Sequence, residues 1–294
     1  SIDRNIQSRV EKALADGLIR SNTTHASAIV MNPQNGQVLA MANLPTYLPA
    51  EFNKVSDISL FNNPVISQPY EPGSDIKTLT MVVGVDKGVV SASDTYNNRD
   101  YVKIGDRTIG NAHKGILGNI TYQQAMNYSL NTGFVDIAMK LGDGKYINRA
   151  ARDIIYDYFH NRFKLGQLTG IELDGEVAGV VIPPTKAEGN AVRYSNMVFG
   201  QGMDVTMVQT VAAFAPIVNG GKYYKPTILA GVVDELGNYK PTPEPQPLSN
   251  PISESSANHV RDMIQLARST FHSNQDKPGY FIGGKTGTSQ IVKD

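Results

Sequence analysis

The sequence contains no cysteine, which excludes disulfides, thiolate metal ligands and a cysteine nucleophile but does not indicate a cellular compartment. It also has no net charge, since 27 basic residues balance 27 acidic ones, and nothing predicts a surface for nucleic acid. No apolar run approaches the roughly 18 residues of a membrane span, and the longest, near residues 211–218, is interrupted by Pro216. No signal peptide is found at the start of the chain. We therefore expect either a soluble protein or a piece of one that is anchored elsewhere.

The composition allows a large folded unit. With 294 residues, 40% of them hydrophobic, the chain can bury a substantial core as one large domain or as two subdomains. The five histidines lie far apart without the spacing of metal ligands, so we expect them to be structural or exposed to solvent. They are His25, His113, His160, His259 and His272.

The stretch around Ser74 and Lys77 combines a candidate nucleophile with a candidate base. Pro72 and Gly73 interrupt whatever precedes them, and apolar residues then recur at helical spacing, which places Ser74 in the first turn of a helix. Because residues three apart share one helix face, we expect the Lys77 amine to reach the Ser74 hydroxyl. A serine needs such a base to become a good nucleophile, and a helix start adds positive partial charge. Alone, the tetrad is a weak signal.

The residues before this stretch are predicted to form a helix and a β-hairpin. Asp3 is the expected N-cap of an amphipathic helix over residues 2–19. Two short apolar runs, residues 27–31 and 37–42, flank a turn rich in Pro, Asn and Gly, which is typical of a hairpin. Since both runs are apolar nearly throughout, we expect the strands to be covered on both faces. An irregular loop over residues 45–69 follows.

Helices are predicted to dominate the middle of the chain. After a small hairpin around residues 101–109, a capping box at Thr121 starts a short helix, a second helix follows it, and a third covers residues 145–160. Ser129 and Asn131 lie at the corner between the first two helices, where both side chains would be exposed on one side of the turn. Taken alone, these two residues are more simply explained as helix caps.

The remainder of the chain is predicted to mix loops, helices and strands. The predicted elements are a loop over residues 166–184, a helix over 205–218, a strand over 226–233, a proline-rich surface connection over 240–251, a helix that begins at Ser253 and a strand over 280–292.

Residues 279–286 match the phosphate-loop pattern Gly-x4-Gly-Lys-Thr letter for letter. That pattern needs a strand before the loop and a helix after it. Here Lys277-Pro278 precedes the pattern, its interior is apolar and strand-like, and Gly-Thr-Ser follows it. We therefore do not predict a nucleotide site.

Three motifs occur together in an order that is far more specific than any one of them. They are Ser74-x-x-Lys77, Ser129-x-Asn131 and Lys285-Thr286-Gly287, about 55 and 155 residues apart. This set resembles the signature of serine penicillin-recognising enzymes. The residues around the motifs, including 199–206 and 219–222, look like the transpeptidase domain of the monofunctional, class B high-molecular-weight penicillin-binding proteins. The resemblance covers essentially the whole chain.

The resemblance implies an α/β (α+β) fold, with an antiparallel β-sheet sandwiched by helices and an added all-α subdomain, as in serine β-lactamases and penicillin-binding transpeptidases. We expect the sheet subdomain to comprise residues 1–70 and 205–294 and the mostly helical subdomain to comprise residues 71–204, with the active site between them. Relatives continue with further strands and a helix, so the chain is expected to lack the last strands and helix of the domain. Relatives also carry a membrane anchor and a pedestal ahead of it.

The resemblance also implies peptidoglycan D,D-transpeptidation. Ser74 would attack the carbonyl between the two D-alanines of a stem peptide, and the acyl group would pass to an amine of a neighbouring stem. Lys77 would be the base, with its pKa lowered by Lys285 and by burial. Ser129 would relay the proton toward the leaving amine, and Asn131 would hold the substrate amide and Lys77.

The third motif is implied to bind substrate through Thr286, Gly287 and Thr288, with the two threonines joining Lys285 on the terminal carboxylate. The backbone N–H groups of Ser74 and Thr288 would form the oxyanion hole. No metal and no cofactor is implied. The expected partners are peptidoglycan stem peptides, β-lactam antibiotics and a glycosyltransferase in the membrane, with no nucleic acid. The expected location is the bacterial cell envelope, at the outer face of the cytoplasmic membrane.

Asp75 departs from the family pattern, which usually has a small or apolar residue after the nucleophile. An acid in the first helical turn suits the helix dipole. One step round the helix from the nucleophile, its side chain is expected to point away from Lys77, and its charge could weaken the affinity for anionic β-lactams.

Two other functions are considered beside transpeptidation. A serine β-lactamase needs a carboxylate that activates a deacylating water, and the acidic segment 170–176 is the nearest match. That segment looks more like a transpeptidase segment and lacks the Asn that would follow such a Glu. A non-catalytic β-lactam sensor or wall-synthesis scaffold would keep the fold and often lose a motif residue, whereas all motif residues are present here.

Overall fold

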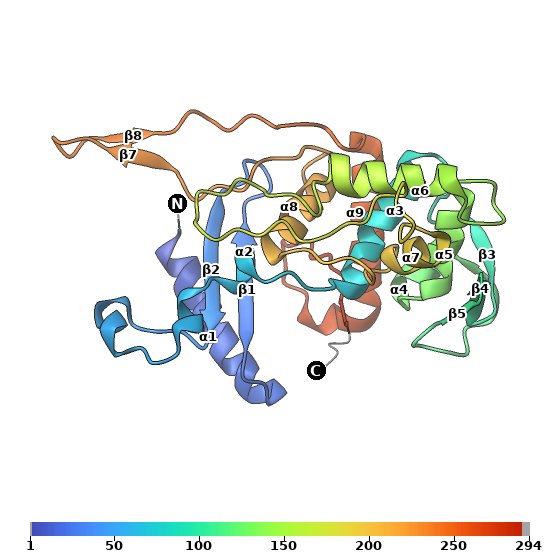
Figure 1. Ribbon diagram of the computed structural model, residues 1–294, viewed down its shortest axis with the longest axis horizontal. Helices are drawn as coiled ribbons and strands as arrows, with labels where there is room; N and C mark the ends of the chain where they lie inside the picture. Colours follow the sequence, from blue (N-terminus) through green and yellow to red (C-terminus); the bar gives the residue numbers. More distant parts are fainter. Residues whose placement is uncertain (1, 290–294) are drawn as a thin grey trace.

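The first helix and its predicted N-cap, Asp3, are both present. The protein is seen as a computed structural model that describes residues 2–289 (Figure 1). Helix α1 (Arg4–Ser21) begins at Asp3, whose carboxylate accepts hydrogen bonds from the backbone N–H groups of Asn5 and Ile6. Both ends of the helix lie two residues later than expected. The short polar side chain at the cap satisfies backbone donors that the first helical turn leaves free.

The predicted hairpin is also present, with β1 (Ala26–Met31) antiparallel to β2 (Val38–Leu44). Helices α2 (Pro64–Ser67) and α8 (Met207–Val218) contact this hairpin (Figure 1). Strand β2 alternates buried and half-buried residues, but β1 is half-buried along its whole length. The expected burial on both faces is therefore wrong for β1. Within the described residues β2 is its only strand neighbour, and this leaves one edge of β1 open.

Helix α1 runs along the other edge of the hairpin. The Asp3 backbone N–H donates to the Leu39 carbonyl at 2.8 Å. The Gln7 side chain accepts from the Met41 N–H at 2.9 Å and donates to the Met41 carbonyl at 3.0 Å. These bonds satisfy strand groups that a free edge would leave to solvent or to another chain.

Helix α3 (Ile76–Asp86) occupies the centre of the molecule, and its residues from 76 to 84 are all buried (Figure 1). It contacts α5 (Asn131–Lys140), α8 and α9 (Glu254–His272), and these helices share the main hydrophobic core. A helix that is apolar all round can only be a buried one. The helix predicted after Ser74 is confirmed, with a 3₁₀ turn over Gly73–Asp75 ahead of it.

The middle of the chain is mostly helical but also carries two small antiparallel sheets. Its other elements are β3 (Thr95–Asn98) paired with β6 (Gly118–Thr121), β4 (Tyr101–Ile104) paired with β5 (Arg107–Gly110), α4 (Tyr122–Asn127), α6 (Arg149–Tyr156) and α7 (Ala191–Met197). The capping box at Thr121 and the hairpin around residues 101–109 are confirmed. The pair β3–β6 and helix α7 were not predicted.

The third helix of this part starts later than the predicted residue 145. The Asp143 carboxylate accepts hydrogen bonds from the backbone N–H groups of Lys145 and Tyr146, which holds this segment in a turn. Asn148 then caps α6, which continues as a π-helical segment over Asp157–Arg162. The wider turn of that segment follows directly on the α-helix.

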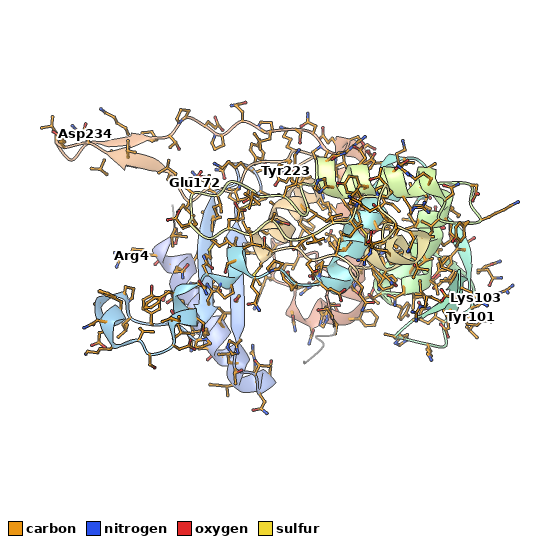
Figure 2. All side chains as sticks on the ribbon, viewed as in Figure 1. Arg4, Tyr101, Lys103, Glu172, Tyr223 and Asp234 are labelled. Carbon is orange, nitrogen blue, oxygen red and sulfur yellow. The ribbon has the colours of Figure 1, made fainter. Side chains whose placement is uncertain are left out.

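The later part of the chain contains a hairpin that projects from the body. Strands β7 (Gly231–Val233) and β8 (Tyr239–Pro241) form it, and Asp234 lies near its tip (Figure 2). The strand predicted over residues 226–233 is therefore confirmed only at its end. Residues before it make a single bridge, between Gln37 and Thr227. Short 3₁₀ helices also occur over Pro49–Lys54, Ile58–Phe61 and Ser273–Gln275.

The strand predicted over residues 280–292 is wrong for residues 280–289, which have no regular structure. Residues 290–292 lie outside the described part of the chain. A strand is defined by its ladder of hydrogen bonds, and no strand in the described part of the chain pairs with residues 280–289. The helix before this segment begins at its predicted cap, Ser253. Across residues 2–289, no helix combines the length and the apolar character that a membrane crossing requires.

Candidate active site

Ser74 lies in the 3₁₀ turn directly ahead of α3, where it is half-buried. The turn is held by close backbone contacts on both sides of Gly73. This glycine has φ +65°, and a Cβ on it would lie 2.5 Å from the Thr288 carbonyl oxygen. The Gly73 N–H donates to the Gly200 carbonyl at 2.9 Å. Within residues 2–289 the Ser74 hydroxyl has no hydrogen-bond partner, which leaves it free to react.

Lys77 is 1% exposed, one turn further along α3. Its Nζ donates to the Ser129 carbonyl at 2.7 Å and to the Ser129 Oγ at 3.0 Å, and it lies 5.6 Å from the Phe134 ring centroid. Burial, and then the charge of Lys285, hold the pKa of Lys77 well below 10.5. The predicted hydrogen bond to Ser74 is not formed in the described part of the chain. Lys77 instead donates hydrogen bonds to Ser129, and its lowered pKa favours the neutral amine.

Ser129 and Asn131 form the corner between α4 and α5. Ser129 has φ +55°, a left-handed conformation that is unusual for a non-glycine residue, and its carbonyl is bound by Lys77. The N-cap of α5 is Leu130, with no side-chain bond, so neither motif residue caps a helix. The Asn131 Nδ2 donates to the Gly110 carbonyl at 2.9 Å. The simpler explanation of this motif as helix caps is therefore wrong.

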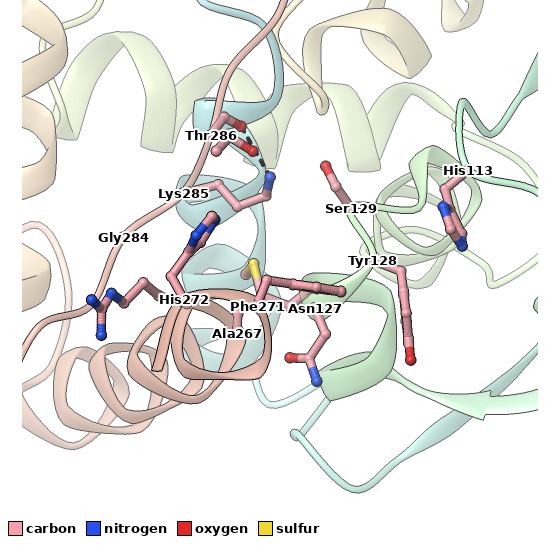
Figure 3. A pocket seen from close by; sticks show the side chains of 12 residues that line it. His113, Asn127, Tyr128, Ser129, Ala267, Phe271, His272, Gly284, Lys285 and Thr286 are labelled. Atoms are coloured by element: carbon pink, nitrogen blue, oxygen red, sulfur yellow. Dashed lines mark hydrogen bonds between the residues drawn. The ribbon is translucent and has the colours of Figure 1, made fainter. Parts of the chain in front are cut away.

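The third motif lies against the first. A Cβ on Gly287 would approach the Pro72 carbonyl oxygen at 2.6 Å, and the Thr288 backbone lies beside Gly73. The half-buried Lys285 donates from Nζ to the Thr286 carbonyl at 3.0 Å (Figure 3). Burial lowers the pKa of Lys285, against the opposing charge of Asp75. No ion pair within residues 2–289 uses Lys285.

A pocket of about 400 Å³ opens between the second and third motifs, with Ser129 on one side and Lys285 on the other (Figure 3). Tyr128 stacks on His113 at 5.5 Å between ring centroids and meets Phe271 edge-on at 5.6 Å. These three side chains come from different parts of the chain. Tyr128 belongs to the family-like residues around the second motif, whereas no motif in the sequence pointed to His113 or Phe271. Among the described residues that line the pocket there is no carboxylate, which suits an anionic ligand.

The segment after α7 supports the turn that holds Ser74. Gly200 has φ +88°, and a Cβ on it would lie 1.8 Å from the Gly73 carbonyl oxygen. The Gly202 N–H donates to the Glu71 carboxylate at 2.6 Å, and Tyr70 pairs with Val205. Only glycine at residue 200 permits this approach.

Gly200→Ala is therefore expected to destabilise the protein by about 2–4 kcal/mol, from backbone strain and overpacking together. Urea unfolding followed by circular dichroism would measure this change. Gly237→Ala is a matched control, since it has φ +81° but nothing within 4 Å of its Cβ position. It should cost only about 1 kcal/mol. Equal losses for the two variants would contradict the close approach at Gly73.

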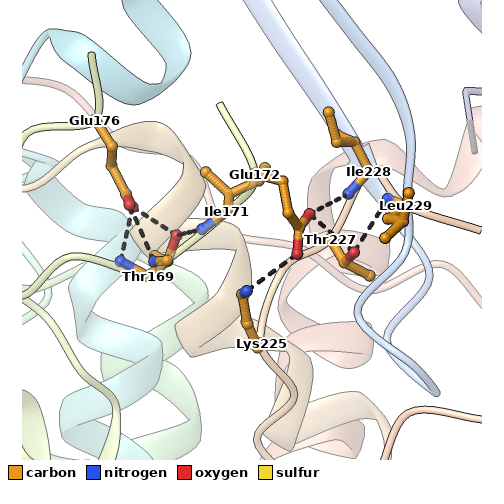
Figure 4. Close-up of polar contacts among 9 residues, drawn as sticks. Thr169, Ile171, Glu172, Glu176, Lys225, Thr227, Ile228 and Leu229 are labelled. Carbon is orange, nitrogen blue, oxygen red and sulfur yellow. Dashed lines mark hydrogen bonds and ion pairs between the residues drawn. The ribbon is translucent and has the colours of Figure 1, made fainter. Parts of the chain in front are cut away.

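The acidic segment 170–176 ties a loop to its neighbours (Figure 4). All four carboxylate oxygens of its two glutamates are engaged. Glu172 binds the Lys225 amine at 3.0 Å, the Thr227 hydroxyl at 2.9 Å and the Ile228 N–H at 3.1 Å, and Glu176 accepts from the Thr169 N–H and hydroxyl and from the Gly170 N–H. Neither glutamate is therefore free to activate a water, as a β-lactamase would need.

Comparison with known proteins agrees with this geometry. A family model described as penicillin binding protein transpeptidase domain matches residues 26–294. Stage V sporulation protein D of Bacillus subtilis is 31% identical over 300 residues, which cover 100% of this chain and 44% of that protein. The chain thus spans less than half the length of this curated relative.

Solved structures resemble the fold closely. The apo form of penicillin-binding protein 3 from Mycobacterium tuberculosis matches with a TM-score of 0.84 and 28% identity, over 99% of this chain and 64% of that one. The same protein complexed with aztreonam matches with a TM-score of 0.80 and 28% identity, over 96% and 59% of the two chains. These matches and the elements described above confirm the predicted α+β fold, which combines helices with antiparallel sheets. The part that was predicted to be all-α is mostly helical and also contains the strand pairs β3–β6 and β4–β5.

Proposed function

The chain belongs to the penicillin-binding protein transpeptidase family, and from this premise we propose that it is a serine D,D-transpeptidase that crosslinks peptidoglycan stem peptides. The observation that carries the proposal is the convergence of the three motifs. Lys77 Nζ is bound to Ser129, and the backbone of Gly287 and Thr288 lies against the turn that presents Ser74. A nucleophile, a base and an anion-binding cation are thus gathered in one place.

In the first half of the reaction, the Ser74 Oγ attacks the carbonyl carbon between the two D-alanines, and its proton passes to the Lys77 Nζ. The C–N bond to the last D-alanine breaks, and the proton moves through the Ser129 Oγ to the departing amine. The 3.0 Å contact between Nζ and Oγ supports this path. A lysine can accept the proton only when it is neutral, which its lowered pKa favours.

Lys285 is the cation proposed to hold the terminal carboxylate, with the hydroxyls of Thr286 and Thr288. Its Nζ has no carboxylate partner within the described residues, so it is available to a ligand. The backbone N–H groups of Ser74 and Thr288 are assigned to the oxyanion hole. The close approach of the Thr288 backbone to Gly73 supports this assignment, because it brings the Thr288 backbone beside the turn that carries Ser74.

In the second half, an amine of a neighbouring stem attacks the ester carbonyl and gives a proton to Lys77. The C–O bond to Ser74 then breaks, and Lys77 returns the proton to the Ser74 oxygen, which leaves as a hydroxyl. Asn131 is assigned to the substrate amide. Its side-chain N–H₂ is already held by the Gly110 carbonyl, so the amide oxygen has a fixed direction. β-Lactams, which imitate the D-Ala-D-Ala end, are the proposed inhibitors of the same serine.

The wider setting is proposed from the family alone. The protein would act in the bacterial cell envelope, at the outer face of the cytoplasmic membrane, beside a membrane glycosyltransferase. Its substrate cleft would lie between a sheet part, residues 1–70 and 205–294, and a helical part, residues 71–204. The two parts share packing, because α9 contributes to the same core as α3.

Intact-protein mass spectrometry after mixing with benzylpenicillin tests the proposal. We expect a mass increase of one drug molecule that persists for hours, since both glutamates of segment 170–176 are engaged in other contacts and are not free to activate a deacylating water. Incubation with a peptide ending in D-Ala-D-Ala and a labelled D-amino acid should also give the exchanged peptide.

Each alternative function gives a different result in these two assays. An adduct that appears and vanishes while the drug is consumed would identify a β-lactamase. A persistent adduct without peptide exchange would identify a β-lactam sensor. No adduct at all on the folded protein would contradict an acylating serine.

A further inference from the structure

Asp75 lies against Gly287 of the third motif, a contact that its position in the sequence did not reveal. Its expected direction was away from Lys77. A Cβ on Gly287 would meet both the Cγ and the Oδ1 of Asp75 at 2.8 Å. The carboxylate therefore touches the backbone of the Lys-Thr-Gly segment, and only a glycine at residue 287 leaves it room.

This carboxylate is poorly satisfied. Its Oδ1 is buried and accepts no hydrogen bond within residues 2–289, and no ion pair there includes Asp75. A buried carboxylate without partners resists ionisation. Burial raises the pKa of Asp75 to about 6, although the charge of Lys285 opposes this rise. The group thus changes its charge within the pH range of ordinary assays.

Three titratable groups interact electrostatically with Asp75 or with Lys285. From the third motif, Lys285 attracts it. Tyr70, in the segment before the turn, is the second group. Burial raises the pKa of Tyr70, a hydrogen bond to Thr210 lowers it, and the charge of Asp75 adds a smaller rise. On α3 itself, Lys77 responds to Lys285. Glu71, the next carboxylate along the chain, is held on the Gly202 N–H instead.

We infer that Asp75 is a specificity-determining residue that competes with the carboxylate of the acyl donor for Lys285, so that anionic donors react best when Asp75 is protonated. This inference rests on the proposed function. An ionised Asp75 offsets the charge of Lys285 and places a like charge near the incoming carboxylate. A protonated Asp75 leaves Lys285 as a free cation, and proton uptake then accompanies donor binding.

The pH dependence has two opposing parts. As pH falls, Lys77 gains a proton and loses its capacity as a base, which slows acylation. Over the same fall Asp75 becomes neutral, which speeds acylation by an anionic donor. Asp75→Asn removes the second part and keeps Lys77, so the ratio of its rate constant to that of the wild type reports the effect of the Asp75 charge.

The test measures the second-order rate constant of acylation by benzylpenicillin from pH 5 to pH 8.5. The rate constant of Asp75→Asn divided by that of the wild type should be near one at pH 5 and rise to about ten by pH 8. A tenfold change corresponds to an interaction that shifts a pKa by about one unit. Its midpoint should lie near the pKa of about 6. Asp75→Ser, which also removes the charge, should give the same rising ratio.

The matched control is Glu71→Gln, which removes the same charge from the same stretch and keeps an oxygen for the Gly202 N–H. Its ratio to wild type should not vary with pH. A constant ratio for both Asp75 variants, or one below unity throughout, would mean that the carboxylate only supports the segment and would overturn the inference. Absence of any adduct on the wild type would instead overturn the proposed function and the inference with it.

Discussion

Ser74→Ala should abolish the covalent capture of benzylpenicillin, with no mass increase even after hours of incubation. The ester bond forms to the Ser74 Oγ, and alanine has no atom that replaces it. Loss of a serine nucleophile costs about 10⁶ in rate in a well-studied serine hydrolase, which is below detection in this assay. Intact-protein mass spectrometry at matched protein and drug concentrations gives the answer directly.

The loss should reflect chemistry, because the substitution removes little else. The Ser74 hydroxyl is half-buried and makes no hydrogen bond within the described residues, so unfolding free energy should change by only about 0.5 kcal/mol. Ser93→Ala, in the exposed turn after α3, is the matched control and should be acylated like the wild type. An adduct on Ser74→Ala at the wild-type stoichiometry would place the nucleophile at another residue.

Local signals in the sequence were sufficient for much of the helical framework. Asp3, Thr121 and Ser253 each cap the helix predicted from them, because a cap is a contact between residues two or three apart. The order of the three motifs likewise pointed to segments that contact one another in the structure. The structure adds what the order cannot give, which is that Lys77 is bound to Ser129 and not to Ser74.

Features that depend on distant partners could not be predicted in the same way. Residues 280–289 have a strand-like composition, yet pairing decides whether a strand forms, and none of the strands among residues 2–289 pairs with them. Strand β1 has β2 as its one strand neighbour within the described residues, so its burial depends on what packs at its other edge. Asp75 was placed from helix geometry alone, whereas the segment around Gly287, more than 200 residues away in the sequence, determines its surroundings.

Lys77→Met is expected to slow acylation by benzylpenicillin about 10³-fold, since the methionine keeps the shape of the buried chain but accepts no proton. Stopped reactions read by intact mass would give the rate. Lys87→Met, which removes a lysine charge from the exposed end of the same helix, should react at the wild-type rate. A wild-type rate for Lys77→Met would exclude this lysine as the base.

The wild type and Lys77→Met also test the charge state of Lys77, through the pH dependence of their stability. In the folded protein its pKa lies well below the 10.5 of the unfolded chain, so the unfolded state binds more protons between these two values. Wild-type stability therefore gains as pH rises through that window, and Lys77→Met lacks this gain. The Tm of the wild type should rise relative to that of the variant between pH 7 and about pH 10. If the difference in Tm did not vary with pH, Lys77 would have to titrate in the folded protein as it does in the unfolded chain. It would then be protonated at neutral pH and could not act as a base.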